Sequence, residues 1–197
     1  MKSLSLQKPH LLIVVGIPGS GKTFFASQFA KMFNAPFIHY EAIKNSFEGS
    51  LSEDLTADVA GLLFAELIKT GETIILEGPG ASRTERAALA HQARSVGYVP
   101  LFIWVQTEPV TAKARAVTGI RGSTNATISL EDFEHELKHF TPLASTEKSV
   151  VISGKHTFAS QAKIILKRLV EPEVAVRKIP VKLTAPRPTR NGRTFIQ

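Results

Sequence analysis

Eight consecutive residues near the start of the chain have the types and spacing that bind a chain of phosphates. They match the pattern G-x-x-x-x-G-K-[ST] and run Gly16-Ile17-Pro18-Gly19-Ser20-Gly21-Lys22-Thr23. The glycines let successive backbone N–H groups curl around an anion, and a following helix adds its positive N-terminal end. We expect Lys22 to reach the β- and γ-phosphates and the Thr23 hydroxyl to bind Mg²⁺. The loop therefore predicts a site for ATP or GTP. The residues expected to hold the nucleotide are Gly16, Pro18, Gly19, Ser20, Gly21, Lys22 and Thr23.

Two acidic residues follow apolar segments and could complete this chemistry. Glu77 comes directly after the apolar run 73–76, where a second ligand for the metal is needed, so Thr23 and Glu77 form the predicted Mg²⁺ site. Glu41 follows the segment 36–40, and Lys44 stands three residues later. A carboxylate there would face the phosphates across a cleft and could take the proton of an acceptor hydroxyl. We predict this catalytic role for Glu41, with a solvated surface charge as the alternative.

Three basic residues farther along the chain could act on the nucleotide. Arg115 and Arg121 flank a segment rich in Gly, Ser, Thr and Asn. A guanidinium on such a segment could close over the transferring phosphoryl group and stabilise its oxygens. Lys155 follows the last apolar run, where we expect a contact with the nucleotide base. Surface charge is the alternative interpretation for all three residues.

The elements that must position these residues follow from hydrophobic periodicity. Short apolar runs alternate with helical patterns, which is typical of α/β proteins with a parallel sheet flanked by helices. The strands are expected over 11–15, 36–40, 73–76, 99–105 and 149–152. The helices are expected over 22–33, 54–69, 83–95, 108–117 and 158–170, with one more between Leu130 and Pro142. We interpret the excursion over about 118–141 as a lid insertion.

Composition excludes several classes of protein. The chain has 197 residues, of which 43% are hydrophobic and 21% charged, so it suits one folded domain rather than a disordered chain. Cysteine is absent, which excludes disulfides, thiolate metal sites and cysteine nucleophiles. No apolar run approaches the roughly 20 residues that cross a bilayer, and the first run continues into the glycine-rich loop. We therefore expect a soluble, cytoplasmic protein without a membrane partner.

The positive charge is concentrated near the C-terminus. The net charge is +7, and residues 171–197 contribute +4 of it through six basic and two acidic residues. Three prolines (180, 186 and 188) exclude a regular helix through this segment. We therefore divide the chain into a domain over 1–170 and a basic, proline-containing arm over 171–197. Such an arm favours an anionic partner such as RNA or DNA, and a solubilising tail is the alternative.

Together these motifs resemble phage-type polynucleotide 5′-kinases and zeta-toxin-like kinases of the P-loop class. The resemblance covers about residues 10–170 and includes Pro18 in the loop, Glu41 followed by Lys44, and Ile74–Glu77 followed by Arg86. It departs from the family pattern in three ways. Glu41 and Glu77 stand where the family has Asp, Lys44 stands where it has Arg, and the two lid arginines are farther apart.

The resemblance implies a P-loop NTPase fold with a five-stranded parallel sheet in the order 2-3-1-4-5 and a lid. It also implies that ATP is the nucleotide and that its γ-phosphate passes to a hydroxyl. The acceptor would be a polynucleotide 5′-hydroxyl or a small molecule such as a nucleotide-sugar. A third alternative is an ATP-switched module that binds RNA or a protein partner and hydrolyses ATP slowly. The oligomeric state stays open.

Overall fold

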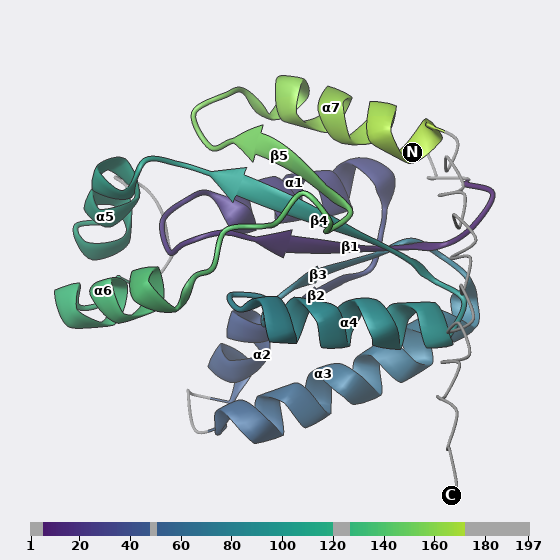
Figure 1. Cartoon of the computed structure of the whole chain (residues 1–197). Coiled ribbons are helices and arrows are strands. Elements are labelled where there is room, and N and C mark those ends of the chain that lie inside the picture. Colours follow the sequence, from purple (N-terminus) through teal and green to yellow (C-terminus); the bar gives the residue numbers. More distant parts are fainter. Residues whose placement is uncertain (1–5, 48–50, 120–126, 172–197) are drawn as a thin grey trace, which may run out of the picture.

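The structure is a computed structural model that describes residues 6–47, 51–119 and 127–171. Within these ranges, five parallel strands form one sheet, and helices cover both of its faces (Figure 1). The strands are β1 (His10–Val15), β2 (Phe37–His39), β3 (Ile74–Glu77), β4 (Val99–Gln106) and β5 (Ser149–Ser153). Their order is β2-β3-β1-β4-β5, which confirms the predicted fold class and strand order.

The helices form two layers and a separate pair. Figure 1 shows α1 (Lys22–Phe33) and α7 (Phe158–Val170) on one face of the sheet, with α3 (Glu53–Leu67) and α4 (Arg83–Ser95) on the other. The short helix α2 (Tyr40–Ser46) follows β2, and the 3₁₀ turn η1 (Ile68–Thr70) ends α3. The pair α5 (Pro109–Val117) and α6 (Leu130–His139) lies beyond the carboxyl end of β4. The described helices lack the combination of length and apolar character that a membrane span needs.

The central strand β1 is apolar without alternation because helices bury both of its faces. Leu12 and Val14 pack in one cluster with Phe25 and Phe29 of α1. Leu11, Ile13 and Val15 pack in the other cluster, which includes residues of α3 and α4. Since β1 lies between β3 and β4, the loop after Val15 emerges at the middle of the carboxyl edge of the sheet. This position is the usual ligand crevice of open α/β sheets.

Two details of the helices differ from the sequence predictions. Residues 40–46 form α2, so Tyr40 begins a helix instead of ending a strand. Apolar residues at helical spacing over 54–69 predict a core face of Leu55, Val59, Leu62 and Leu63. In α3 the buried stripe instead consists of Thr56, Ala60 and Phe64, and the three leucines are exposed. The helix carries two apolar stripes, and periodicity alone does not tell which of them faces the sheet.

Two predicted features lie wholly or partly outside the described residues. Arg121 falls in the gap 120–126, and the basic arm falls in 172–197 apart from its first residue. The lid and the arm therefore stay predictions. Of the proposed lid, α6 is described, and its Phe133 is buried against Ile17 of the glycine-rich loop and Ala112 of α5.

A fully buried arginine holds the loop that follows β3. Arg86 Nε and Nη2 donate to the two carboxylate oxygens of Glu147 at 2.6 and 3.2 Å. Arg86 Nη1 also donates to the carbonyls of Gly80 and Ala81, each at 3.0 Å. The Ala144 N–H donates to Glu147 at 2.7 Å. The guanidinium therefore ties the loop after β3 to the segment before β5.

Replacing Glu147 with Ala is expected to lower the free energy of unfolding by about 3–5 kcal/mol, because it leaves a buried guanidinium without its counter-charge. The hydrogen bond from Arg86 is the main cause that holds the pKa of Glu147 below its ordinary value. A lowered carboxyl pKa stabilises the fold above the unfolded-state pKa, and this stability is lost as pH falls through the folded-state pKa.

Urea unfolding over a descending pH series measures both effects. The difference between wild type and Glu147→Ala should shrink as the pH falls into the acid range. The control is Glu66→Ala, since Glu66 forms an exposed ion pair with Lys69 at 2.7 Å and such pairs contribute little. A pH-independent difference for Glu147→Ala would contradict the assignment.

Candidate active site

The glycine-rich loop joins β1 to α1 and is packed tightly against its neighbours. Gly19 has a φ of +72°, and a Cβ there would collide with the carbonyl oxygen of Ala112 in α5. Gly21 caps α1 with a φ of +103°. Ser20 is fully buried, and its Oγ has no hydrogen-bond partner among the described residues. Glycine is therefore required in this loop by both backbone conformation and space, and the loop keeps a polar atom available for a ligand.

The structure brings the two predicted metal ligands together, although they are 54 positions apart in the sequence. Thr23 Oγ1 donates to Glu77 Oε1 at 2.7 Å. Glu77 is buried at the end of β3, and its Oε2 has no hydrogen-bond partner in the described part of the chain. His39 of β2 lies near, with its Nε2 3.8 Å from that oxygen and so beyond hydrogen-bond range. A hydroxyl and a carboxylate are the hard oxygen ligands that Mg²⁺ prefers, so this pair fits the metal.

Lys22 is close enough to Glu77 for the carboxylate to act on its ammonium group. Its Nζ donates to the carbonyl of Ile17 at 3.1 Å. Burial lowers the pKa of Lys22, while the negative charges of Glu77 and Glu136 oppose that shift. An anionic phosphate beside this ammonium would favour the charged form in the same way as the two carboxylates do.

Glu136 is a site residue that sequence analysis missed. It belongs to α6, and its negative charge opposes the lowering of the Lys22 pKa. The signal that could have identified it is helical spacing, since Glu136 stands three residues after Phe133 and four before Phe140. Both aromatic residues pack in the cluster that includes Ile17 of the loop. The face of α6 that meets the loop therefore carries a carboxylate.

Glu41 and Lys44 lie on α2, at the carboxyl end of the edge strand β2. The helix is held there by Tyr40, because a Cβ at Gly78 would collide with the Tyr40 ring. Glu41 is exposed and has no hydrogen bond or ion pair to any residue that the structure describes. The side chain is therefore available to a ligand at the β2 end of the carboxyl edge.

Arg115 and Lys155 lie on the opposite side of the loop, toward β5. Arg115 Nη1 donates to the carbonyl of Gly154 at 3.4 Å. A hollow of about 580 Å³ opens here, and Lys155 is not among its lining residues because it pairs with Glu108 at 2.9 Å. The lining residues are Gly21, Phe24, Ala114, Arg115, Thr118, Gly119 and Gly154. The roles of Arg115 at the phosphoryl group and of Lys155 at the base stay predictions.

Gly154 supports the loop from the end of β5. A Cβ at this position would collide with the carbonyl oxygen of Ser20 and with Thr107 Oγ1. Thr107 Oγ1 in turn donates to that Ser20 carbonyl at 3.0 Å. Gly154 and Thr107 therefore fix the position of the loop backbone.

Replacing Gly154 with Ala is expected to weaken nucleotide binding tenfold or more, because the loop must move to admit the methyl group. Overpacking of this kind also lowers stability by about 1–3 kcal/mol. Titration with a fluorescent ATP analogue and thermal melting measure the two effects. Gly61→Ala in α3 is the control, since a Cβ there meets nothing within 4 Å, and its nucleotide affinity should equal that of wild type. Equal affinity for Gly154→Ala would show that the contact does not position the loop.

Comparison with known proteins places these observations in a family. The profile of a family described as an AAA domain matches residues 11–143, which include the loop, Glu41, Glu77 and α6. A comparison with curated proteins finds no match.

Three solved structures with the same fold are distant from this chain in sequence. A gluconokinase from Sinorhizobium meliloti is 18% identical, with a TM-score of 0.59 over 82% of this chain and 91% of that one. A sugar kinase from Janibacter is 19% identical, also with a TM-score of 0.59, over 82% of this chain and 94% of that one. Kti12 from Chaetomium thermophilum in complex with ADP-AlF3 is 15% identical, with a TM-score of 0.60 over 80% of this chain and 96% of that one. At these identities the likeness shows the fold alone. With two thirds of its residues matched by the family profile, the chain belongs to the AAA domain family of P-loop proteins.

Proposed function

We propose that this protein is an ATP-dependent phosphotransferase that moves the γ-phosphate of ATP to a hydroxyl group of an acceptor. The observation that carries the proposal is the contact between Thr23 and Glu77 beside the glycine-rich loop. It supplies a hydroxyl and a carboxylate for Mg²⁺ next to the lysine that would hold the phosphates. The solved structures named as a gluconokinase and a sugar kinase support the same reaction class.

In the proposed mechanism, Lys22 and the loop N–H groups hold the β- and γ-phosphates. Thr23 and Glu77 would hold Mg²⁺, which would neutralise charge on the phosphates. Glu41 takes the proton of the acceptor hydroxyl as its oxygen attacks the γ-phosphorus. The bond between that phosphorus and the bridging oxygen breaks, and ADP leaves with the electron pair. Arg115, together with Arg121, would stabilise the oxygens of the transferring group.

Charge in the described part of the cleft favours a small hydroxylated acceptor. The charge of Glu136 acts on Lys22 of the loop, and Glu41 lies on α2 at the carboxyl end of β2 together with Lys44. A polynucleotide brings several phosphates, which two carboxylates would repel. A compound with hydroxyls and at most one or two negative charges avoids this repulsion and can use Lys44. The names of the gluconokinase and sugar kinase structures point to the same class.

A polynucleotide 5′-hydroxyl is the second candidate acceptor, and the basic arm over 171–197 is the observation that favours it. An arm that follows a phosphate backbone would place only the terminal hydroxyl in the cleft. Truncation after Val174 should then weaken RNA binding and flatten its salt dependence, because fewer counterions are released.

The test is incubation with γ-labelled ATP and a panel of acceptors. The panel contains sugars, sugar acids, sugar nucleotides, and RNA and DNA with 5′-hydroxyl ends. Label on a sugar or sugar acid supports the proposal as stated, and label on a 5′ end replaces the small acceptor with a polynucleotide. Release of labelled phosphate alone, with every acceptor, would overturn the transfer reaction and support an ATP-switched binding module.

A further inference from the structure

We propose that copies of this chain associate head to tail, with helix α3 of one copy lying in the groove between α1 and α7 of the next. The inference does not depend on the catalytic activity. It rests on two exposed apolar surfaces that lie on opposite faces of the sheet (Figure 1). Acidic residues border one of them, and lysines border the other.

The first surface is the outward stripe of α3. Leu55 and Leu62 are 47% and 71% exposed, and Val59 lies between them at helical spacing. The three positions are four and three residues apart, so they form one continuous seam along the helix. Apolar residues that form one exposed stripe, instead of being scattered singly, give a surface that another helix can cover.

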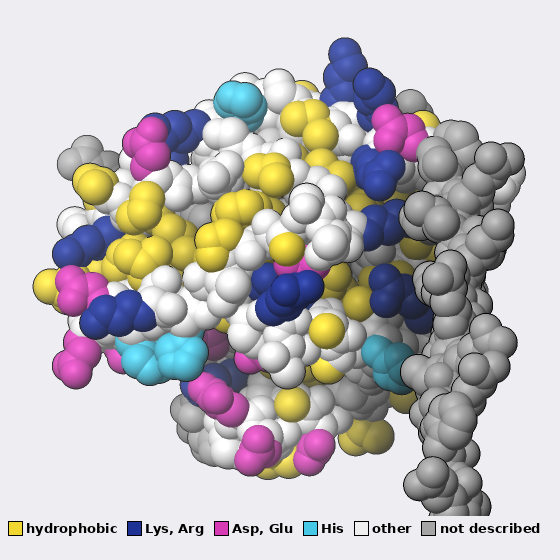
Figure 2. All heavy atoms as spheres, viewed as in Figure 1, with side chains coloured by type: hydrophobic (Ala, Val, Ile, Leu, Met, Phe, Trp, Pro, Cys, Tyr) yellow, Lys and Arg dark blue, Asp and Glu magenta, His cyan; other side chains and the backbone are white. Residues whose placement is uncertain are grey.

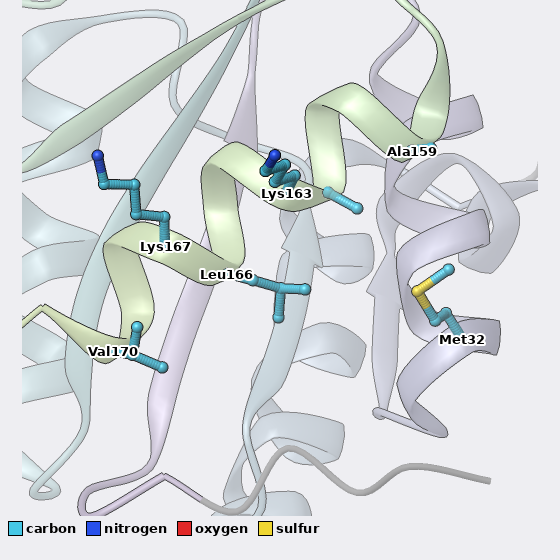
Figure 3. A pocket seen from close by; sticks show the side chains of 7 residues that line it. Met32, Ala159, Lys163, Leu166, Lys167 and Val170 are labelled. Carbon is cyan, nitrogen blue, oxygen red and sulfur yellow. The ribbon is translucent and has the colours of Figure 1, made fainter.

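The second surface is a shallow groove of about 490 Å³ between α1 and α7. Met32 enters it from α1, and the other labelled residues come from α7 (Figure 3). Met32 is 47% exposed and Val170 is 71% exposed. The lining residues are Met32, Ala159, Ala162, Lys163, Leu166, Lys167 and Val170. A groove between two helices with an apolar floor has the shape that accepts the apolar face of a third helix.

The charges around the two surfaces are complementary. Helix α3 carries four acidic residues and no basic one. Near the groove, α1 and α7 carry the exposed lysines Lys31, Lys163 and Lys167 and no acidic residue. Figure 2 shows Lys and Arg side chains gathered over α7 at the upper right and acidic side chains along the bottom edge, toward α2 and α3, with others at the lower left over α6. Asp54 and Asp58 are one turn apart beside the α3 seam, and Lys163 and Lys167 are one turn apart along the groove. This equal spacing allows both aspartates of one copy to meet both lysines of the next. Because the chain carries both complementary surfaces, a second copy of it is the favoured partner.

The arrangement dictates the symmetry of the assembly. Because α3 and the groove lie on opposite faces of the sheet, one copy cannot present both surfaces to the same partner. Each contact is therefore heterologous, and repeated contacts build a ring or an open chain of subunits.

Sedimentation velocity of the full-length chain over about two orders of magnitude in concentration tests this assembly. The wild type should grow beyond its monomer mass of 21.5 kDa, and growth should weaken at high salt because the rim contacts are ionic. Leu62→Lys and the double variant Lys163→Glu/Lys167→Glu should each stay monomeric. Val110→Lys is the control, since Val110 is an 81% exposed apolar residue on α5, away from both surfaces, and should assemble as wild type does.

Mixing the two defective variants distinguishes head-to-tail contact from the alternatives. The Leu62→Lys copy keeps its groove and the lysine double variant keeps its α3, so the mixture should form a one-to-one dimer and stop there. A wild type that stays monomeric would overturn the proposal. A lysine double variant that assembles normally would also overturn it, because α3 would then pair with another α3.

Discussion

Replacing Lys22 with Met is expected to abolish ATP turnover while the fold stays intact. The side chain reaches the Ile17 carbonyl at 3.1 Å and lies in the field of Glu77, at the centre of the proposed phosphate site. Methionine keeps an unbranched side chain of similar size and removes the ammonium group with its charge and hydrogen-bond donors. Loss of one charge-assisted contact to the transferring phosphate typically lowers kcat by about 10²–10³-fold or more. A steady-state ATPase assay measures the loss.

Lys31→Met is the matched control for this experiment. Lys31 lies in the last turn of the same helix and is exposed, so its replacement removes the same charge far from the loop. Its turnover should equal that of wild type, and thermal melting should show that both variants fold. If Lys22→Met hydrolysed ATP as fast as Lys31→Met, the loop would not be the nucleotide site.

The sequence predicted the sheet and several helices well because local signals mark them. Each buried strand is a short apolar run, and turn-forming or charged residues flank it on both sides. Helices α1, α4 and α7 begin and end where the sequence analysis placed them. Ser82 and Thr157 cap α4 and α7 by accepting a hydrogen bond from a backbone N–H three residues later, a signal that is visible in the sequence. The strand order came from the resemblance to P-loop kinases rather than from these local signals.

The sequence failed where contacts between distant segments decide the outcome. Helix α2 is seven residues long, and none of its residues is fully buried. The packing of the Tyr40 ring on Gly78 holds it in place. The choice between the two stripes of α3 depends on the shape of the sheet beneath it, and so does the exposure of Leu62. Arginine is usually found on the surface, yet Arg86 is completely buried. Its ion pair with Glu147, 61 positions away, compensates for the loss of hydration.

The site shows the same division. The contact between Thr23 and Glu77 could be predicted because both residues follow strands that end at one edge of the sheet. Helical spacing places Glu136 on the same face of α6 as Phe133 and Phe140, but only the folded structure shows that this face packs on the loop. Gly154 was also missed, since its role is to leave room for Ser20 and only the folded structure shows how close they are.

Replacing Glu41 with Gln is expected to lower phosphoryl transfer by about 10²–10⁴-fold with nearly unchanged ATP affinity. The amide keeps the size of the side chain but cannot accept the proton of the acceptor hydroxyl. Glu41 is exposed at the start of α2, so the replacement should leave the stability of the fold as it is. Glu41→Asp keeps the carboxylate with a shorter reach, and it should recover part of the lost rate.

The measurement is single-turnover transfer of labelled phosphate to the acceptor that the panel identifies, with ATP affinity determined in parallel. Glu53→Gln is the matched control, because Glu53 is also an exposed glutamate in the first turn of a helix, α3, and should transfer at the wild-type rate. A base acts only in the transfer step, so its loss lowers the rate constant for transfer and leaves the binding constant alone. If Glu41→Gln and Glu53→Gln transferred phosphate equally fast, the proton would leave by another route. Glu136, the second carboxylate near Lys22, would then be the next residue to replace.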